Sequence, residues 1–197
     1  MSSPSATELR ALSASKLLSV FRDLQAPGLD EMNGDYDAKL LQQPSTIDEV
    51  AGWLSVGIPF MPWLSKGFRP VNSAEGRGYN SFRQFGKVVQ RYPMKTLIAP
   101  SRYDDQPAYT LVYRAYHSFC GTINMVDEVR RVSDGVYLGI GTCGFSTGRR
   151  QVPLPFLLQD TGRPYIGDIG SARKAFEPGP RELPALLAPT RSPGADG

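Results

Sequence analysis

Asp127 is the acidic residue whose place in the sequence is most typical of a chemical role. It lies in the β-rich segment 122–132, where residues two apart share one face of a strand, so its neighbours on that face are Ile123, Met125 and Val129. A carboxylate among apolar side chains must pair with a cation, take up a proton or have a raised pKa. Asp127 is therefore predicted to be a general base or half of a buried ion pair. The candidate cations are Arg91, Lys95, Arg102 and Arg114.

Tyr113 and His117 are the predicted acid and base partners of Asp127. They lie in the segment 108–117, where period-two spacing places them on one face with Tyr109. That face is apolar with hydroxyl and imidazole tips, which is typical of a ligand-cavity wall and also of an ordinary core face. We interpret Tyr113 and His117 as catalytic candidates and Tyr109 as a ligand contact.

Further ligand contacts are expected from aromatic and flexible side chains near a pocket mouth. The segment 53–79 is rich in aromatic residues, which either sandwich a flat ligand or fill one end of the fold as core. Gly139 and Gly141 share a strand face with an aromatic residue, and they either allow a bend or make room for a ligand. The predicted substrate-binding residues are Trp53, Trp63, Tyr79, Tyr109, Met125 and Tyr137.

Several classes of site are disfavoured by what the sequence lacks. His117 is the single histidine, so no multi-histidine metal site is expected, and we predict neither a metal nor a cofactor. A haem held by His117 is the alternative. CxxC, HExxH, P-loop and GxSxG motifs are absent from the sequence. Cys120 and Cys143 are interpreted as reduced structural thiols, with a nucleophile beside His117 and a disulfide as alternatives.

The charge pattern bears on partners and location. The formal net charge is +3 and the basic residues are scattered, so no nucleic-acid partner is expected. There is no run of about 18 apolar residues and no secretory signal, which predicts no membrane span and a cytoplasmic protein. The expected partner is a small hydrophobic molecule, and the oligomeric state is left open.

The elements that must position these residues are mainly β. Helices are predicted at 6–24 and 45–56, followed from residue 66 by short β-rich runs separated by turns. Asp134-Gly135 between two such runs is the strongest hairpin signal. We predict an antiparallel up-and-down β-barrel, with an N-terminal helix and a second short helix covering one end. One domain is expected over 1–170, with a flexible Pro/Gly-rich tail over 171–197.

The stretch 66–158 resembles the lipocalin-like, calycin-type small barrels. The runs that carry the resemblance are KGFRPV, GYNSFR, VVQRYPMKT, MVDEVRRVSDGVYLGIGT and PLPFLL. The chain lacks the early G-x-W motif and the disulfide pattern of the secreted members. It is more similar to intracellular barrels that bind hydrophobic ligands or haem, or that steer cyclisations in natural-product pathways. The resemblance implies a fold and a pocket, and it assigns no catalytic residue.

The sequence thus predicts a barrel that binds a small, mostly apolar molecule. As an enzyme it would be a cofactor-independent isomerase or cyclase of secondary metabolite biosynthesis, which holds its substrate in one conformation. The alternatives are a non-catalytic carrier or sensor, and a protein-interaction module built on 53–79 and the tail. Which face of the segment 122–132 points inward is also left undecided. The opposite assignment would bring Asn124, Glu128 and Arg130 into the pocket.

Overall fold

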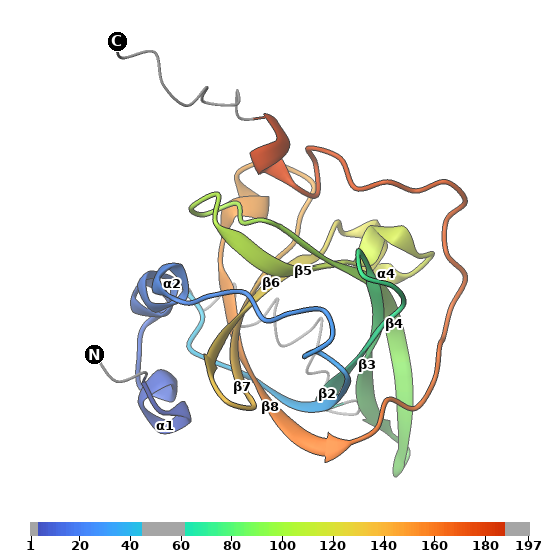
Figure 1. The fold of residues 1–197 in the computed structure, drawn as a ribbon, viewed down its shortest axis with the longest axis horizontal. Coiled ribbons are helices and arrows are strands. Elements are labelled where there is room, and N and C mark those ends of the chain that lie inside the picture. Colours follow the sequence, from blue (N-terminus) through green and yellow to red (C-terminus); the bar gives the residue numbers. More distant parts are fainter. Residues whose placement is uncertain (1–3, 45–61, 188–197) are drawn as a thin grey trace.

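The structure is a computed structural model that describes residues 4–44 and 62–187. Eight antiparallel strands follow one another around a closed barrel in sequence order, and the last strand pairs with the first (Figure 1). The prediction of a mainly β, up-and-down barrel is confirmed. The strands are β1 Gly34–Leu40, β2 Trp63–Pro70, β3 Gly76–Gln84, β4 Lys87–Pro100, β5 Pro107–Val112, β6 Val126–Ser133, β7 Val136–Thr142 and β8 Leu154–Arg163.

The N-terminal helix is divided in two, so the prediction of one helix over 6–24 is wrong in this respect. α1 spans Ala6–Arg10 and α2 spans Ala14–Asp23. The division occurs because the Ser13 side chain accepts a hydrogen bond from the Lys16 amide and begins a new helix. α2 packs its apolar face on the outer wall of the barrel at β7 and β8. The second predicted helix, 45–56, lies outside the described residues.

The segment 108–117 is not one strand, which corrects the predicted face. β5 ends at Val112, and a 3₁₀ turn (η1, Tyr113–Ala115) leads to the short helix α4 at Phe119–Thr122. The Ser118 side chain accepts from the Gly121 amide and so caps α4. Asn124 then has a φ of 53°, and β6 begins only at Val126. The predicted strand 122–132 is therefore a strand only in its second part.

The Asp134-Gly135 hairpin is present between β6 and β7, and Gly135 has a φ of +67°, which glycine adopts readily. At this end of the barrel the segment 25–33 crosses the opening (Figure 1). Below it, tightly packed aromatic side chains fill the interior. They are Tyr36, Phe68, Tyr109 and Tyr137. This end of the barrel is therefore closed by core packing.

The C-terminal segment leaves β8 and runs along the outside of the barrel to Leu187 (Figure 1). The Arg173 amide donates to the carbonyl of Ala115, and residues 116 and 172 form an isolated β-bridge. Further on, Glu182 and Leu183 are buried, with exposed fractions of 4% and 5%. This part of the predicted flexible tail thus contacts the barrel. Among the described residues, no helix is long and apolar enough to cross a bilayer.

Candidate functional site

Four polar side chains meet inside the barrel, and we call them the Lys66 cluster: Lys66, Asn80, Tyr113 and Asp127. Each is at most 3% exposed. The Lys66 ammonium contacts the other three, at 2.9 Å from Asn80 Oδ1, 2.5 Å from the Tyr113 hydroxyl and 2.9 Å from Asp127 Oδ2. The Tyr113 hydroxyl also lies 2.9 Å from Asp127 Oδ2. A buried ion pair is thus held within a hydrogen-bonded network.

Strand register explains why these residues meet. Lys66 on β2 is directly opposite Asn80 on β3, so both side chains point to the same side of the sheet. Asp127 on β6 is directly opposite Gly141 on β7. A Cβ atom at Gly141 would lie 2.9 Å from Asp127 Oδ1, so the glycine leaves the space that the carboxylate occupies. β6 runs toward the Asp134-Gly135 hairpin, which places Asp127 near the opposite end of the barrel.

Aromatic rings enclose the Lys66 ammonium. Its nitrogen lies 5.1, 5.3 and 5.2 Å from the ring centres of Trp63, Tyr113 and Phe156, within the range of a cation–π contact. The Trp63 indole also donates to Asn80 Oδ1 at 3.1 Å. Phe156 fits because Gly139 has no side chain, since a Cβ there would lie 2.1 Å from the ring. The room left by both glycines of β7 is therefore used by the protein's own side chains.

The hydrogen-bond accounting leaves Lys66 fully satisfied. Its ammonium group has three hydrogens and three acceptors at hydrogen-bond distance. The Tyr113 oxygen accepts from Lys66 and Asn80 and donates to Asp127. Burial raises the pKa of Tyr113 well above its ordinary value, and the negative charge of Asp127 adds to the effect. Tyr113 therefore stays protonated and acts as a donor.

The structure brings together some of the predicted catalytic residues and separates others. Asp127 and Tyr113 are in direct contact. His117 is exposed, so its predicted place on a pocket wall is wrong, because the chain leaves the strand at Val112. Its amide donates to the Ser171 carbonyl at 3.4 Å, on the outside of the barrel.

The predicted ligand-binding residues are also distributed. Trp63 borders the Lys66 cluster, and Met125 is buried in the same core. Tyr109 and Tyr137 are buried toward the closed end, where their hydroxyls donate to Thr96 and Glu31 respectively. Tyr79 is on the outer face of the wall, where it stacks on Tyr165 and accepts from the Ile166 amide. Trp53 lies outside the described residues.

Lys66 and Asn80 are the residues that sequence reasoning missed, and Lys66 is the cation that pairs with Asp127. The four predicted cations have other partners. Arg102 pairs with Glu128 and Arg114 with Glu182. Lys95 pairs with Glu75, and Arg91 donates to Gln84. A signal was present: Lys66 alternates with Phe68, an aromatic residue two positions on, which places a charge on an inward strand face.

No disulfide bond joins Cys120 and Cys143. Cys120 is buried in the core beside the cluster, and burial raises the pKa of its thiol. A protonated, buried thiol is a poor nucleophile, which fits a packing role. Over the part of the chain that the structure describes, no three His, Cys, Asp or Glu side chains are grouped so that they could hold a metal ion.

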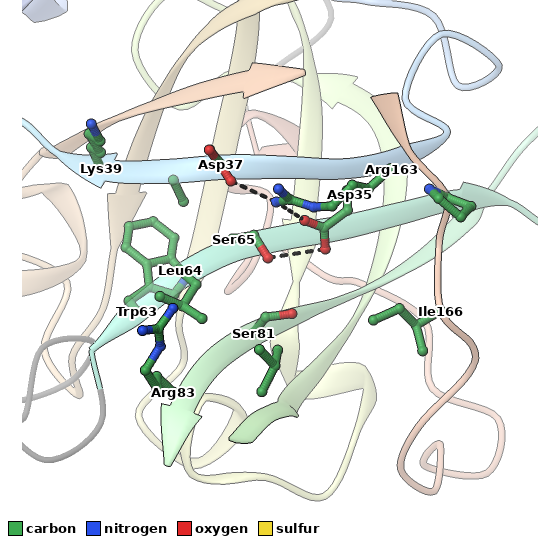
Figure 2. A pocket seen from close by; sticks show the side chains of 13 residues that line it. Asp35, Asp37, Lys39, Trp63, Leu64, Ser65, Ser81, Arg83, Arg163 and Ile166 are labelled. Carbon is green, nitrogen blue, oxygen red and sulfur yellow. Dashed lines mark hydrogen bonds and ion pairs between the residues drawn. The ribbon is translucent and has the colours of Figure 1, made fainter. Parts of the chain in front are cut away.

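A hollow lies on the outer face of β1, β2 and β3, and we call it the outer groove (Figure 2). Its volume is about 730 Å³, within the range of small-molecule pockets. Arg163 bridges Asp35 and Asp37 at its rim, at 2.8 and 2.6 Å. Trp63 belongs to both places, since it lines the outer groove and its indole donates to Asn80 inside.

Comparison with known proteins finds a similar fold and does not show a family. No family model and no curated protein matches the chain. Its structure is similar to the crystal structure of a protein from Thermomonospora curvata, with a TM-score of 0.50 and 15% sequence identity. The similarity covers 76% of this chain and 88% of that one. At this identity the likeness concerns the fold alone. A β-barrel of this kind is compatible with small-molecule binding.

Proposed function

We propose that this chain binds a small, mostly apolar molecule inside the barrel and holds a polar atom of that molecule at the Lys66 cluster. The observation that carries the proposal is the convergence of four polar side chains on one point of an otherwise apolar and aromatic interior. Small-molecule sites have this composition, with a few convergent polar groups in an apolar lining.

The energetic cost of the cluster supports a role beyond packing. Removing two charges from water costs several kcal/mol for each ion, and apolar residues of similar volume often stabilise a core equally well or better. Lys66 and Asp127 have exposed side-chain fractions of only 3% and 4%. A barrel that needed only a packed interior would gain little from this pair. A ligand that uses the pair gives a reason for its presence.

We further propose that the cluster directs an isomerisation or cyclisation in secondary metabolite biosynthesis, without a cofactor. For a substrate with a ketone, Lys66 and Tyr113 donate hydrogen bonds to the carbonyl oxygen and stabilise an enolate. The Asp127 carboxylate accepts a proton from the adjacent carbon and returns it to another carbon, so no oxidant or reductant is consumed. The substrate oxygen replaces Asn80 as the acceptor of one Lys66 hydrogen and Asp127 as the acceptor of the Tyr113 hydrogen, which frees the carboxylate to accept the proton from carbon.

A non-catalytic carrier is the second candidate. It is favoured by the complete satisfaction of Lys66, whose three hydrogens already have acceptors within the protein. A carrier requires only that the apolar part of its ligand is enclosed, and the cluster then serves as a fixed polar wall. Exchange of solvent deuterium into a bound ketone separates the two, because only the enzyme removes a proton from carbon.

The binding proposal is tested by incubating the protein with a cell extract and identifying retained small molecules by native mass spectrometry. Wild type should retain a molecule that the double variant Lys66→Met/Asp127→Leu releases. Lys95→Met/Glu75→Leu is the matched control, because it replaces a partly exposed Lys–Glu ion pair that is not part of the Lys66 cluster. Equal retention by wild type and the double variant would refute a role for the cluster in binding.

A further inference from the structure

The outer groove is separate from the barrel interior, and its floor contains an unusual hydroxyl. Ser81 on β3 is only 1% exposed, and it lines the groove. Its Oγ is buried and has no hydrogen-bond partner among the residues that the structure describes. Its cross-strand neighbour Ser65 differs, since the Ser65 hydroxyl donates to Asp35 at 3.0 Å. A buried hydroxyl without a partner costs free energy, and a ligand atom would remove that cost.

The charges of the groove favour an anion. Asp35 and Asp37 are already paired with Arg163 (Figure 2). Lys39 and Arg83 also line the groove and are exposed, and within the described part of the chain neither side chain has an ion-pair partner. The groove therefore has an excess of positive charge where Lys39 and Arg83 line it.

The two cations and the hydroxyl lie on one surface. Ser81 and Arg83 are two residues apart in β3, so their side chains project from the same outer face. Lys39 projects from the outer face of β1, on the other side of β2. In Figure 2, Ser81 lies between Arg83 and Ile166. An oxygen placed near Ser81 is thus approached from one side by a cation and from the other by apolar surface.

Apolar side chains line the rest of the groove. Val88 and Ile166 are large hydrophobic residues with exposed fractions of 53% and 67%. Leu64, on β2, also lines the groove. Binding of a ligand that covers this exposed apolar area is favourable, because the area is removed from water. The groove thus combines a cationic end with an apolar trough.

We propose that the outer groove is a second binding site, for a small organic acid with an apolar body. The carboxylate lies between Lys39 and Arg83 and accepts a hydrogen bond from the Ser81 hydroxyl. The apolar body covers Leu64, Val88 and Ile166. The site is distinct from the Lys66 cluster, and it does not depend on the function proposed for the barrel interior.

The test uses decanoate as the probe. Its binding to the full chain is measured by calorimetry and by changes in amide chemical shifts in NMR spectra. Decanoate should bind, and the shifts should concentrate on β1 to β3. Neutral 1-decanol should bind more weakly, because it lacks the charge. In Lys39→Gln/Arg83→Gln the Kd for decanoate should rise about tenfold, as expected for two exposed charge contacts. The matched control is Lys16→Gln/Arg22→Gln, which removes the same charge from exposed positions of α2.

Ser81→Ala separates binding from folding. It removes a hydroxyl that has no partner in the unbound protein, so the unfolding midpoint should not fall, yet the Kd for decanoate should rise about threefold or more. Equal decanoate affinity in the Lys39/Arg83 variant and the Lys16/Arg22 control would overturn the proposal. Chemical shifts confined to the barrel interior, or no binding of decanoate at millimolar concentration, would overturn it as well.

Discussion

The ammonium group of Lys66 lies 2.9 Å from a carboxylate oxygen of Asp127, although the two residues are 61 positions apart in the sequence. Lys66 is on β2 and Asp127 is on β6, which are opposite walls of an eight-stranded barrel. The ion pair therefore spans the interior, and Tyr113, which follows β5, contacts both of its members. Because both charges are buried, the stability of the barrel depends on each having its partner.

The first prediction concerns the energy of this pair. Lys66→Met and Asp127→Leu should each lower the free energy of unfolding by about 3–5 kcal/mol, because each leaves one buried charge without its partner. The double variant should recover most of the loss, since it removes both charges from the core. Urea unfolding followed by fluorescence measures all three variants. Losses that simply add in the double variant would show that the two side chains do not interact energetically.

The second prediction concerns the packing of Gly139 against Phe156. Gly139→Ala should lower the free energy of unfolding by about 1–3 kcal/mol, because the new methyl group overlaps the ring. Adding Phe156→Leu should restore part of that loss. Gly148→Ala is the matched control, since a Cβ there meets nothing within 4 Å and its φ is −61°. Thermal unfolding that is unchanged by Gly139→Ala would contradict the close packing of Phe156 against Gly139.

These results show which features follow from local sequence and which do not. Alternation in segment 122–132 placed Asp127 among apolar neighbours, and Asp134-Gly135 located the hairpin, because both signals act over a few residues. The pairing of Asp127 with Lys66 depends on barrel closure across opposite walls, and no local pattern encodes it. The end of β5 at Val112 was missed because Tyr113 and Ala115 continue the apolar alternation while the backbone turns. The break between α1 and α2 required recognition of Ser13 as a cap.

The third prediction concerns acid stability through Asp168. Its carboxylate accepts from Arg69 at 2.6 and 2.8 Å and pairs with Arg77 at 3.0 Å, and the Arg69 hydrogen bonds hold its pKa below the ordinary value. A lowered folded-state pKa contributes stability above the unfolded pKa of about 3.9, and the contribution is lost as the pH falls through the folded-state pKa. The difference in thermal unfolding midpoint between wild type and Asp168→Asn should thus be constant from pH 5 to 7 and shrink below about pH 4. A difference that persists unchanged at pH 2 would contradict the assignment.

The last prediction concerns the C-terminal segment. Composition predicts a flexible tail over 171–197, whereas Leu183 is 5% exposed and Glu182 accepts hydrogen bonds from Arg114 and the Gly179 amide. The Arg102 side chain donates to the Glu182 carbonyl, and it also pairs with Glu128 on β6, so the segment is connected to the barrel wall. Leu183→Ala should therefore lower the free energy of unfolding by about 1.5–3 kcal/mol, the value of a buried leucine side chain. Leu187→Ala is the matched control, because Leu187 is 71% exposed and its substitution should change the free energy of unfolding little.

Deletion of residues 175–197 should lower the thermal midpoint at least as much as Leu183→Ala does. A deletion that leaves the midpoint unchanged would show that the segment is dispensable, as its composition alone suggests.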